Sequence, residues 1–187
     1  MFLMLPVVLL IFDFSLTSEL SYAQLMEIIA SPEIFIAAAA ERTKHIKLGT
    51  GVISVGYHNP LWIAERIVQL DHMTRGRVML GVGPGSLPTD AAMIGVDQSE
   101  TRDLLEQGFD VVVKLLRGEE PVNFKNHRWD LRNAHLHLRP YSDPLFDMAV
   151  AAVASAAGRV VVRAAASPTI LTTTYRSEPS FSDDPRL

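Results

Sequence analysis

The sequence contains no cysteine among its 187 residues. This absence excludes disulfide bonds, thiolate metal sites and a cysteine nucleophile. It also lacks an excess of basic residues, with a formal net charge of −4 and a pI of about 5.8. Because nucleic-acid-binding proteins usually carry a basic surface, this charge predicts small-molecule partners and no nucleic acid.

Positive charge is also absent from the N-terminal segment, because no Lys or Arg precedes Arg42. Residues 1–12 are mostly apolar, and Ser21-Tyr22-Ala23 resembles a signal-peptide cleavage site, but a signal peptide normally carries a basic start. The run is shorter than the roughly 20 apolar residues that span a bilayer. We therefore expect a cytoplasmic protein that does not associate with membranes. Residues 1–26 are interpreted as a separate segment, with a buried strand or helix and an exported chain as alternatives.

Three helix starts are visible after residue 26. Ser31-Pro32-Glu33 and Asn59-Pro60 each place a capping side chain before proline, and Ser99-Glu100 opens a longer apolar pattern. Asp71 and Arg75 lie four residues apart on the second helix. Such a pair is typical of an ion-paired or solvated helix face.

Apolar strand-like runs alternate with these helices. They cover residues 45–55, 77–82 and 145–154, and residues 122–140 have the pattern of a hairpin. Strands that alternate with helices predict right-handed crossovers and a parallel sheet. The tail, residues 159–187, is rich in Ser, Thr, Pro and Arg without sustained periodicity, so we expect it to be disordered or not native to the fold.

A G-x-G-x-G pattern ends the second strand, at residues 81–85. In a dinucleotide-binding turn, such glycines lie directly before a helix whose amides bind phosphate. Here Pro84 and Pro88 remove two amide donors, and helix signals resume only near Ser99. The pattern leaves two interpretations open, a phosphate contact and a bend that carries the chain across the mouth of a barrel.

Histidine supplies the candidate acid–base chemistry. His58 follows the first strand and precedes a helix cap, where it can contact a ligand, shuttle protons or only close the turn. His135 and His137 share one face of a strand and His127 is near them in sequence. Because neither cysteine nor clustered carboxylates complete a zinc site, we expect no metal.

Several collinear motifs resemble one enzyme family. The sequence contains A-E-R-T at residues 40–43, L-G-T-G at 48–51, Y-H-N-P at 57–60, A-E-R-I-V-Q-L-D at 64–71 and T-R-G-R before the glycines. This series resembles the bacterial luciferase-like flavin monooxygenases. The continuation through about residue 155 is similar to their limonene monooxygenase branch.

This resemblance implies an α/β fold, a TIM (β/α)8 barrel that binds reduced flavin at its C-terminal face. A whole barrel takes about 250 residues, so residues 27–158 are expected to form a partial barrel, roughly its first half. The implied activity is insertion of one oxygen atom from O2 into a small hydrophobic, terpene-like substrate with FMN. The alternatives are a deazaflavin-dependent hydride transfer and a non-catalytic truncated remnant. A separate flavin reductase is implied, and a homo-oligomer is compatible with the resemblance.

The resemblance also carries site residues. His58 matches a family histidine and is the candidate catalytic residue. The Thr50-Gly51-Val52 segment would form a bulge against the isoalloxazine ring, with the non-proline cis peptide that the family often has there. The other candidate cofactor-binding residues are Gly83, Gly85 and, near the flavin phosphate, Ser155. Pro84 replaces the arginine with which luciferases contact that phosphate.

Overall fold

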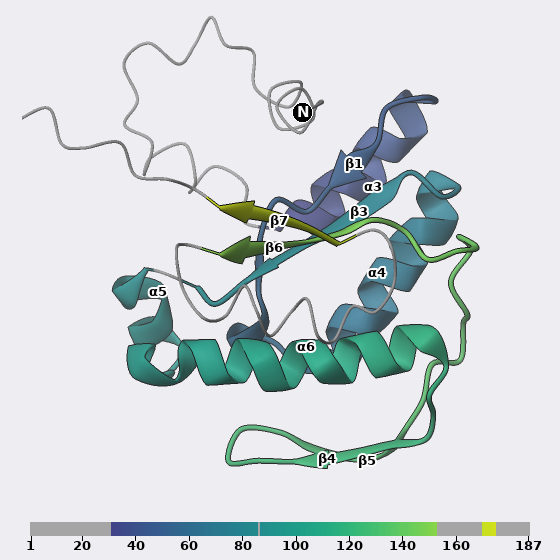
Figure 1. Ribbon diagram of the computed structural model, residues 1–187. Helices are drawn as coiled ribbons and strands as arrows, with labels where there is room; N and C mark the ends of the chain where they lie inside the picture. Colours follow the sequence, from purple (N-terminus) through teal and green to yellow (C-terminus); the bar gives the residue numbers. More distant parts are fainter. Residues whose placement is uncertain (1–30, 86, 153–169, 175–187) are drawn as a thin grey trace, which may run out of the picture.

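The computed structural model describes residues 31–85, 87–152 and 170–174 (Figure 1). Its helices are α3 (Pro32–Arg42), α4 (Pro60–Thr74), α5 (Pro88–Met93) and α6 (Thr101–Arg117), with the 3-10 turns η2 (Val55–Tyr57) and η3 (Gln98–Glu100). Its strands are β1 (Leu48–Gly49), β2 (Ile53–Ser54), β3 (Val78–Gly83), β4 (Val122–Lys125), β5 (Asp130–Ala134), β6 (Met148–Ala152) and β7 (Ile170–Thr174).

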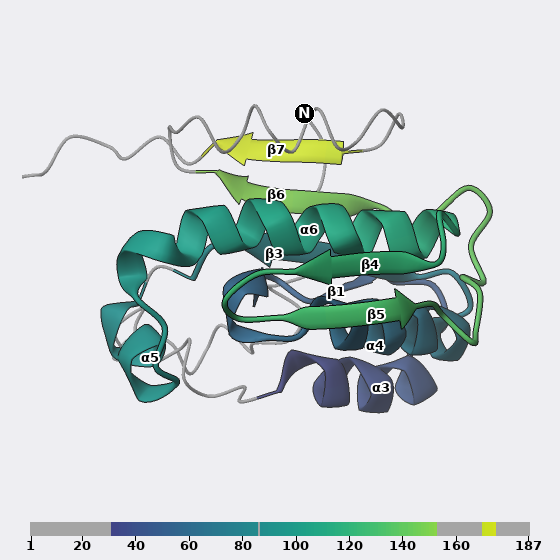
Figure 2. The same ribbon diagram turned by 90° about the horizontal axis from the view of Figure 1, so that it is seen from below.

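One parallel sheet organises the molecule. Its order is β1-β3-β6-β7, and β2 pairs with β3 as well. Helices α4 and α6 lie on one face of the sheet, and α3 packs against α4 beside β1 (Figures 1 and 2). The antiparallel β4–β5 hairpin lies beyond α6, on the side away from the sheet (Figure 1). Parallel strands connected by helices on one face form a sector of a (β/α)8 barrel, as the sequence predicts.

The core lies between this sheet and its helices. Val78, Leu80 and Val82 of β3 are no more than 1% exposed. They pack with the apolar faces predicted for α4 and α6, namely Ile63, Ile67, Leu70, Leu105, Phe109, Val112 and Leu116. Met79 and the glycines of β3 alternate with these residues and face the other side, which in a closed barrel is the interior.

The helix starts are partly as predicted. The Asn59 side chain accepts a hydrogen bond from the Leu61 amide at 2.9 Å, whereas Ser31 precedes α3 without a side-chain cap. The expectation of no helix before Ser99 is wrong, because α5 begins at Pro88. Proline at a first helical position was the local signal for it. None of the helices in the described part has the length and apolar character needed to cross a bilayer.

Strand β7 lies within residues 159–187, for which the sequence predicts disorder or a segment not native to the fold. It pairs in parallel with β6 over all five residues. The run Ile-Leu-Thr-Thr-Thr is mostly β-branched, which favours a strand once a neighbouring edge is present. The strand expected at residues 145–154 is confirmed, since Met148–Ala152 forms β6 inside that run.

Arg77 connects the ends of two helices to the sheet. Its guanidinium donates to the carbonyl oxygens of Ala40 in α3 at 3.2 Å and Thr74 in α4 at 2.8 Å. It also donates to the Ile46 carbonyl at 3.0 Å, just before β1. Carbonyls in the last helical turn have no partner within the helix and carry partial negative charge. One side chain therefore satisfies acceptors from three segments.

Asp71 was expected on a solvated or ion-paired face, and this expectation is wrong. The residue is fully buried near the end of α4. Its carboxylate accepts hydrogen bonds from the Ser142 amide at 2.8 Å and the Ser142 hydroxyl at 2.7 Å. Only the tertiary fold brings the segment before β6 to this position, so the helical spacing could not reveal the contact.

We expect Asp71→Ala to lower the free energy of unfolding by about 3 kcal/mol, because it leaves two Ser142 donors without their acceptor. Urea denaturation with a constant m-value would measure the loss. Asp110→Ala is the matched control, since the Asp110 side chain is 49% exposed and pairs with Lys114 one turn away. That change should stay within about 0.5 kcal/mol. Equal losses in the two variants would contradict the role given to Asp71.

Candidate functional site

The candidate site lies where the parallel strands end. Residues 50–58 follow β1 and surround β2, and Pro84 and Gly85 follow β3. Because the strands are parallel, these segments come together at one edge of the sheet. In (β/α)8 barrels this C-terminal edge carries the chemistry.

The segment Thr50–Val52 is a bulge between β1 and β2. Gly49 pairs with Met79 and Ile53 pairs with Val82, so three residues on one side oppose two on β3. The Thr50 hydroxyl crosses this break: it donates to the Gly81 carbonyl at 3.0 Å and accepts from the Gly81 amide at 2.9 Å. The expected strand over residues 45–55 is therefore interrupted, and Thr50 replaces the missing ladder bonds.

The glycines of β3 make room for this bulge. A Cβ atom at Gly81 would lie 1.8 Å from the Gly51 carbonyl oxygen, and one at Gly83 would lie 2.7 Å from a Val52 methyl group. Gly85, with φ of +80°, is pressed against Tyr57, whose ring would be 2.5 Å from a Cβ there. The absent side chains thus accommodate the protein's own chain. Of the two interpretations of the glycine pattern, the structure favours the bend.

The bulge itself presents an open surface. Gly51 has φ of +68°, and a Cβ atom there would meet no described atom within 4 Å. Val52 is 48% exposed. We call these two residues the Gly51–Val52 ledge. The expected non-proline cis peptide is not found at this position, because the cis bonds within the described residues precede Pro121 and Pro144.

His58 follows η2 and directly precedes the cap of α4. Its amide donates to the Val55 carbonyl at 3.1 Å, and its side chain is half-buried. Burial lowers the pKa of His58 below its ordinary 6.5; the positive charges of Arg66 and Arg128 lower it further, while Glu33 acts in the opposite direction. The imidazole is therefore mainly neutral at pH 7 and able to accept a proton.

Three neighbouring polar residues were not predicted from the sequence. The Tyr57 hydroxyl oxygen is buried without a hydrogen-bond partner among the described residues, and burial together with Asp90 raises the pKa of this phenol. Arg66 lies near Glu33, with Nε 3.6 Å from Oε1. Arg128 reaches the same region from the hairpin. Tyr57 and Arg66 belong to the motifs Y-H-N-P and A-E-R, whereas nothing local marked Arg128.

The remaining candidates lie elsewhere. Ser155 is outside the described residues. His135 and His137 do form a pair, with ring centroids 4.6 Å apart at the end of the hairpin. In the described ranges, no group of three or more ligating side chains could hold a metal ion.

The Gly51–Val52 ledge has the character that a flat, apolar ligand ring requires. The ledge is apolar and lies at the edge where barrel ligands bind. The Thr50 hydroxyl is already bonded to Gly81, so its role is to hold the bulge. Among the described residues that follow β3, Pro84 offers no amide donor to a phosphate. The ledge is therefore suited to an apolar ring, whereas Pro84 adds no contact to a phosphate.

The described sheet and helices form a sector of a (β/α)8 barrel, the scaffold of a class of enzymes that carry their chemistry at the C-terminal edge of the sheet. The sequence model of the family described as luciferase-like monooxygenase matches residues 12–176, and the chain belongs to this family. The match extends beyond residues 27–158 on both sides.

Two relatives share 48% identity with the chain. Limonene 1,2-monooxygenase of Rhodococcus erythropolis matches over 133 residues, 71% of this chain and 34% of the relative. 4-Hydroxyprotoasukamycin monooxygenase of Streptomyces nodosus subsp. asukaensis matches over 130 residues, 70% of this chain and 35% of the relative. The chain thus spans about a third of the length of these relatives. An F420-dependent glucose-6-phosphate dehydrogenase of Amycolatopsis mediterranei is 32% identical over 57% of this chain and 33% of its own.

Solved structures of similar fold support a partial (β/α)8 barrel. A monooxygenase from Streptomyces bottropensis superposes with a TM-score of 0.62 at 28% identity, covering 72% of this chain and 41% of its own. The oxygenating constituent of 3,6-diketocamphane monooxygenase from Pseudomonas putida, in complex with FMN, superposes with a TM-score of 0.60 at 25% identity. The match covers 70% of this chain and 40% of that structure's chain. These luciferase-like TIM-barrel neighbours confirm the expected partial barrel.

We expect Gly81→Ala to destabilise the chain by roughly 3 kcal/mol, because the new methyl group would overlap a backbone carbonyl that cannot move without displacing the bulge. Gly49→Ala is a matched control on the neighbouring strand. The atom nearest to its Cβ would be the flexible end of the Met79 side chain, at 3.3 Å, and the Met79 Cβ and carbonyl oxygen would lie at ordinary contact distances of 3.7 and 3.9 Å. A loss under about 1 kcal/mol is expected there. Similar melting temperatures for the two variants would contradict the conclusion that the bulge packs directly against Gly81.

Proposed function

We propose that the chain forms part of a flavin-dependent monooxygenase that transfers one oxygen atom of O2 to a small hydrophobic substrate, with FMN as its flavin. The observation that carries this proposal is the exposed Gly51–Val52 ledge at the C-terminal edge of a luciferase-like barrel. The FMN held by a 25% identical neighbour supports the choice of flavin. Reduced flavin would supply the electrons that O2 activation requires.

The chain's own residues would have distinct tasks. Gly51 and Val52 would contact the flavin ring, and Thr50 would hold them in place through Gly81. His58, neutral at pH 7, would accept or return a proton beside the ligand. Gly83 and Gly85 would act indirectly, by admitting Val52 and Tyr57. Ser155 as a phosphate contact stays a prediction.

A terpene-like substrate is the finer part of this proposal. Its support is the limonene and diketocamphane named among the relatives, together with the apolar character of Val52 and Ala151 near Gly83. A second candidate, hydride transfer with a deazaflavin, is supported by the F420-dependent relatives. The flavin reductase, a homo-oligomer, the domain boundaries and the cytoplasmic location also stay predictions.

Anaerobic titration tests the cofactor proposal. Reduced FMN should bind the chain with a dissociation constant in the micromolar range and quench its two tryptophans. Reduced F420, titrated in parallel, distinguishes the two candidates, since tighter binding of F420 would favour hydride transfer. Absence of binding by both at micromolar concentrations would refute a cofactor site in this chain.

His58→Gln tests the proton-transfer role. With reduced FMN, O2 and limonene, we expect product formation to fall about 100-fold while the FMN dissociation constant changes less than about threefold, because the amide cannot exchange a proton. The control is His45→Gln, an exposed residue before β1. Turnover within about twofold of the parent chain for both variants would exclude His58 as an acid–base group.

A further inference from the structure

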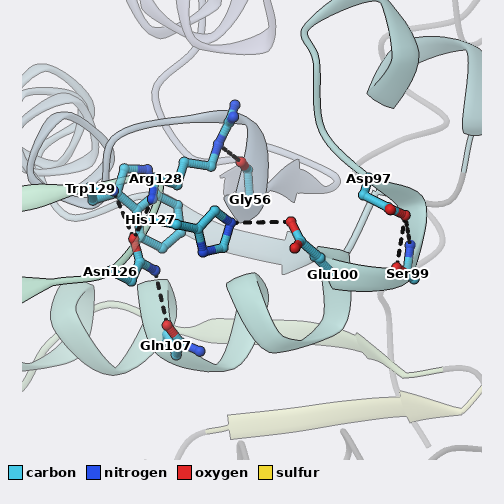
Figure 3. Close-up of polar contacts among 9 residues, drawn as sticks. All are labelled: Gly56, Asp97, Ser99, Glu100, Gln107, Asn126, His127, Arg128 and Trp129. Carbon is cyan, nitrogen blue, oxygen red and sulfur yellow. Dashed lines mark hydrogen bonds and ion pairs between the residues drawn. The ribbon is translucent and has the colours of Figure 1, made fainter.

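The tip of the β4–β5 hairpin is held by a network of hydrogen bonds (Figure 3). The Asn126 side-chain carbonyl accepts hydrogen bonds from the amides of Arg128 at 2.8 Å and Trp129 at 2.7 Å. Its side-chain amide donates to Gln107 of α6 at 2.9 Å. Asparagine closes the turn in this way because its short side chain reaches the backbone two and three residues ahead. The hairpin therefore presents Arg128 from a turn that is itself anchored to a helix.

The same tip is packed against the loop of the candidate site. Trp129 is only 5% exposed and belongs to a cluster with Ala91, Val96 and Leu104, against which Tyr57 also packs. Gly108 of α6 makes this approach close. A Cβ atom there would lie 3.0 Å from the Trp129 ring and 2.6 Å from a Val55 methyl group. The Trp129 indole and Val55 of η2 therefore both pack against α6 at Gly108, where there is no side chain to separate them from the helix.

Arg128 makes the polar contact between the two segments. Its Nε donates to the Gly56 carbonyl oxygen at 2.7 Å, across 72 positions of sequence (Figure 3). Gly56 is held from another side by Leu104, whose Cβ would lie 3.1 Å from a Cβ atom at Gly56. His58 comes two residues later, with its amide bonded to Val55 across this turn. His58 thus lies two residues beyond the carbonyl to which Arg128 is bonded, on the same short turn.

We propose that Arg128 is a positioning residue for His58: its hydrogen bond to the Gly56 carbonyl fixes the η2 turn and thereby the place of the imidazole beside the Gly51–Val52 ledge. The functional part of this inference rests on the proposed flavin site. The positioning itself does not depend on any ligand. The charged groups that influence His58 are Arg66, Glu33 and Arg128, from three different elements.

Three variants of the full chain test the proposal without ligand. Arg128→Met removes charge and donor, Arg128→Lys keeps the charge but loses the planar Nε geometry, and Arg132→Met is the control. Arg132 lies on the same hairpin with 79% of its side chain exposed and bonds only to Asp130 among the described residues. His58 is followed by NMR, through the titration of its imidazole and the hydrogen exchange of its amide.

We expect Arg128→Met to raise the pKa of His58, because a positive neighbour is lost, and to speed exchange of its amide about tenfold. Arg128→Lys should change the pKa less while still speeding exchange, and Arg132→Met should change neither. Unaltered titration and exchange in Arg128→Met, with an unaltered melting temperature, would overturn the proposal. If Arg128→Met fails to fold, the exchange rate in Arg128→Lys decides the question.

Activity then separates this inference from the proposed function. With reduced FMN and limonene, Arg128→Met should lower kcat at least tenfold while KM changes less than about threefold, since misplacement of an acid–base group affects the chemical step. If the parent chain binds no flavin but His58 responds as expected, the proposed function fails and the positioning role stands. Equal losses in Arg128→Met and Arg132→Met would contradict a specific role for Arg128.

Discussion

The contact between the Gly51 carbonyl and Gly81 is the constraint on which this structure depends. The Thr50–Val52 bulge can lie on β3 only because no Cβ projects from Gly81 or Gly83 at these points. The Thr50 hydroxyl then satisfies both polar groups of Gly81, which would otherwise be buried without partners. β1 and β2 follow the same edge of β3 with a shift in register, and the bulge exposes Val52 at the end of the sheet.

This constraint changes how the glycine pattern is understood. Glycines after a strand are easily interpreted as space for a cofactor, yet here the space beside Gly81, Gly83 and Gly85 is occupied by another part of the chain. The open surface is the bulge, one strand away from the pattern. A ligand would therefore meet Gly51 and Val52, and the glycines of β3 would determine how far these project. Packing at β3 thus decides the shape of the proposed ligand surface.

Much of the fold could be predicted from local signals. Asn59-Pro60 and the spacing of Ile63, Ile67 and Leu70 define α4, because capping and apolar periodicity are properties of neighbouring residues. The expectation for Asp71 was wrong for the opposite reason. Its partner Ser142 lies 71 positions away, and helical spacing cannot report a distant donor. β7 was not predicted because its five residues form a strand only where the edge of β6 is available.

The candidate site likewise has features that local sequence predicts and contacts that depend on the tertiary fold. The sequence by itself determined the alternation of helices and strands, the family resemblance and the position of His58 after a strand, because motifs and periodicity are properties of consecutive residues. Its apolar pattern continued one strand through Thr50, Gly51 and Val52, and the resemblance alone marked them as a bulge. Only the tertiary structure decided that Thr50 holds the bulge and that Arg128 reaches Gly56. Those contacts join segments 31 and 72 positions apart, and their energy depends on distances that chain order does not contain.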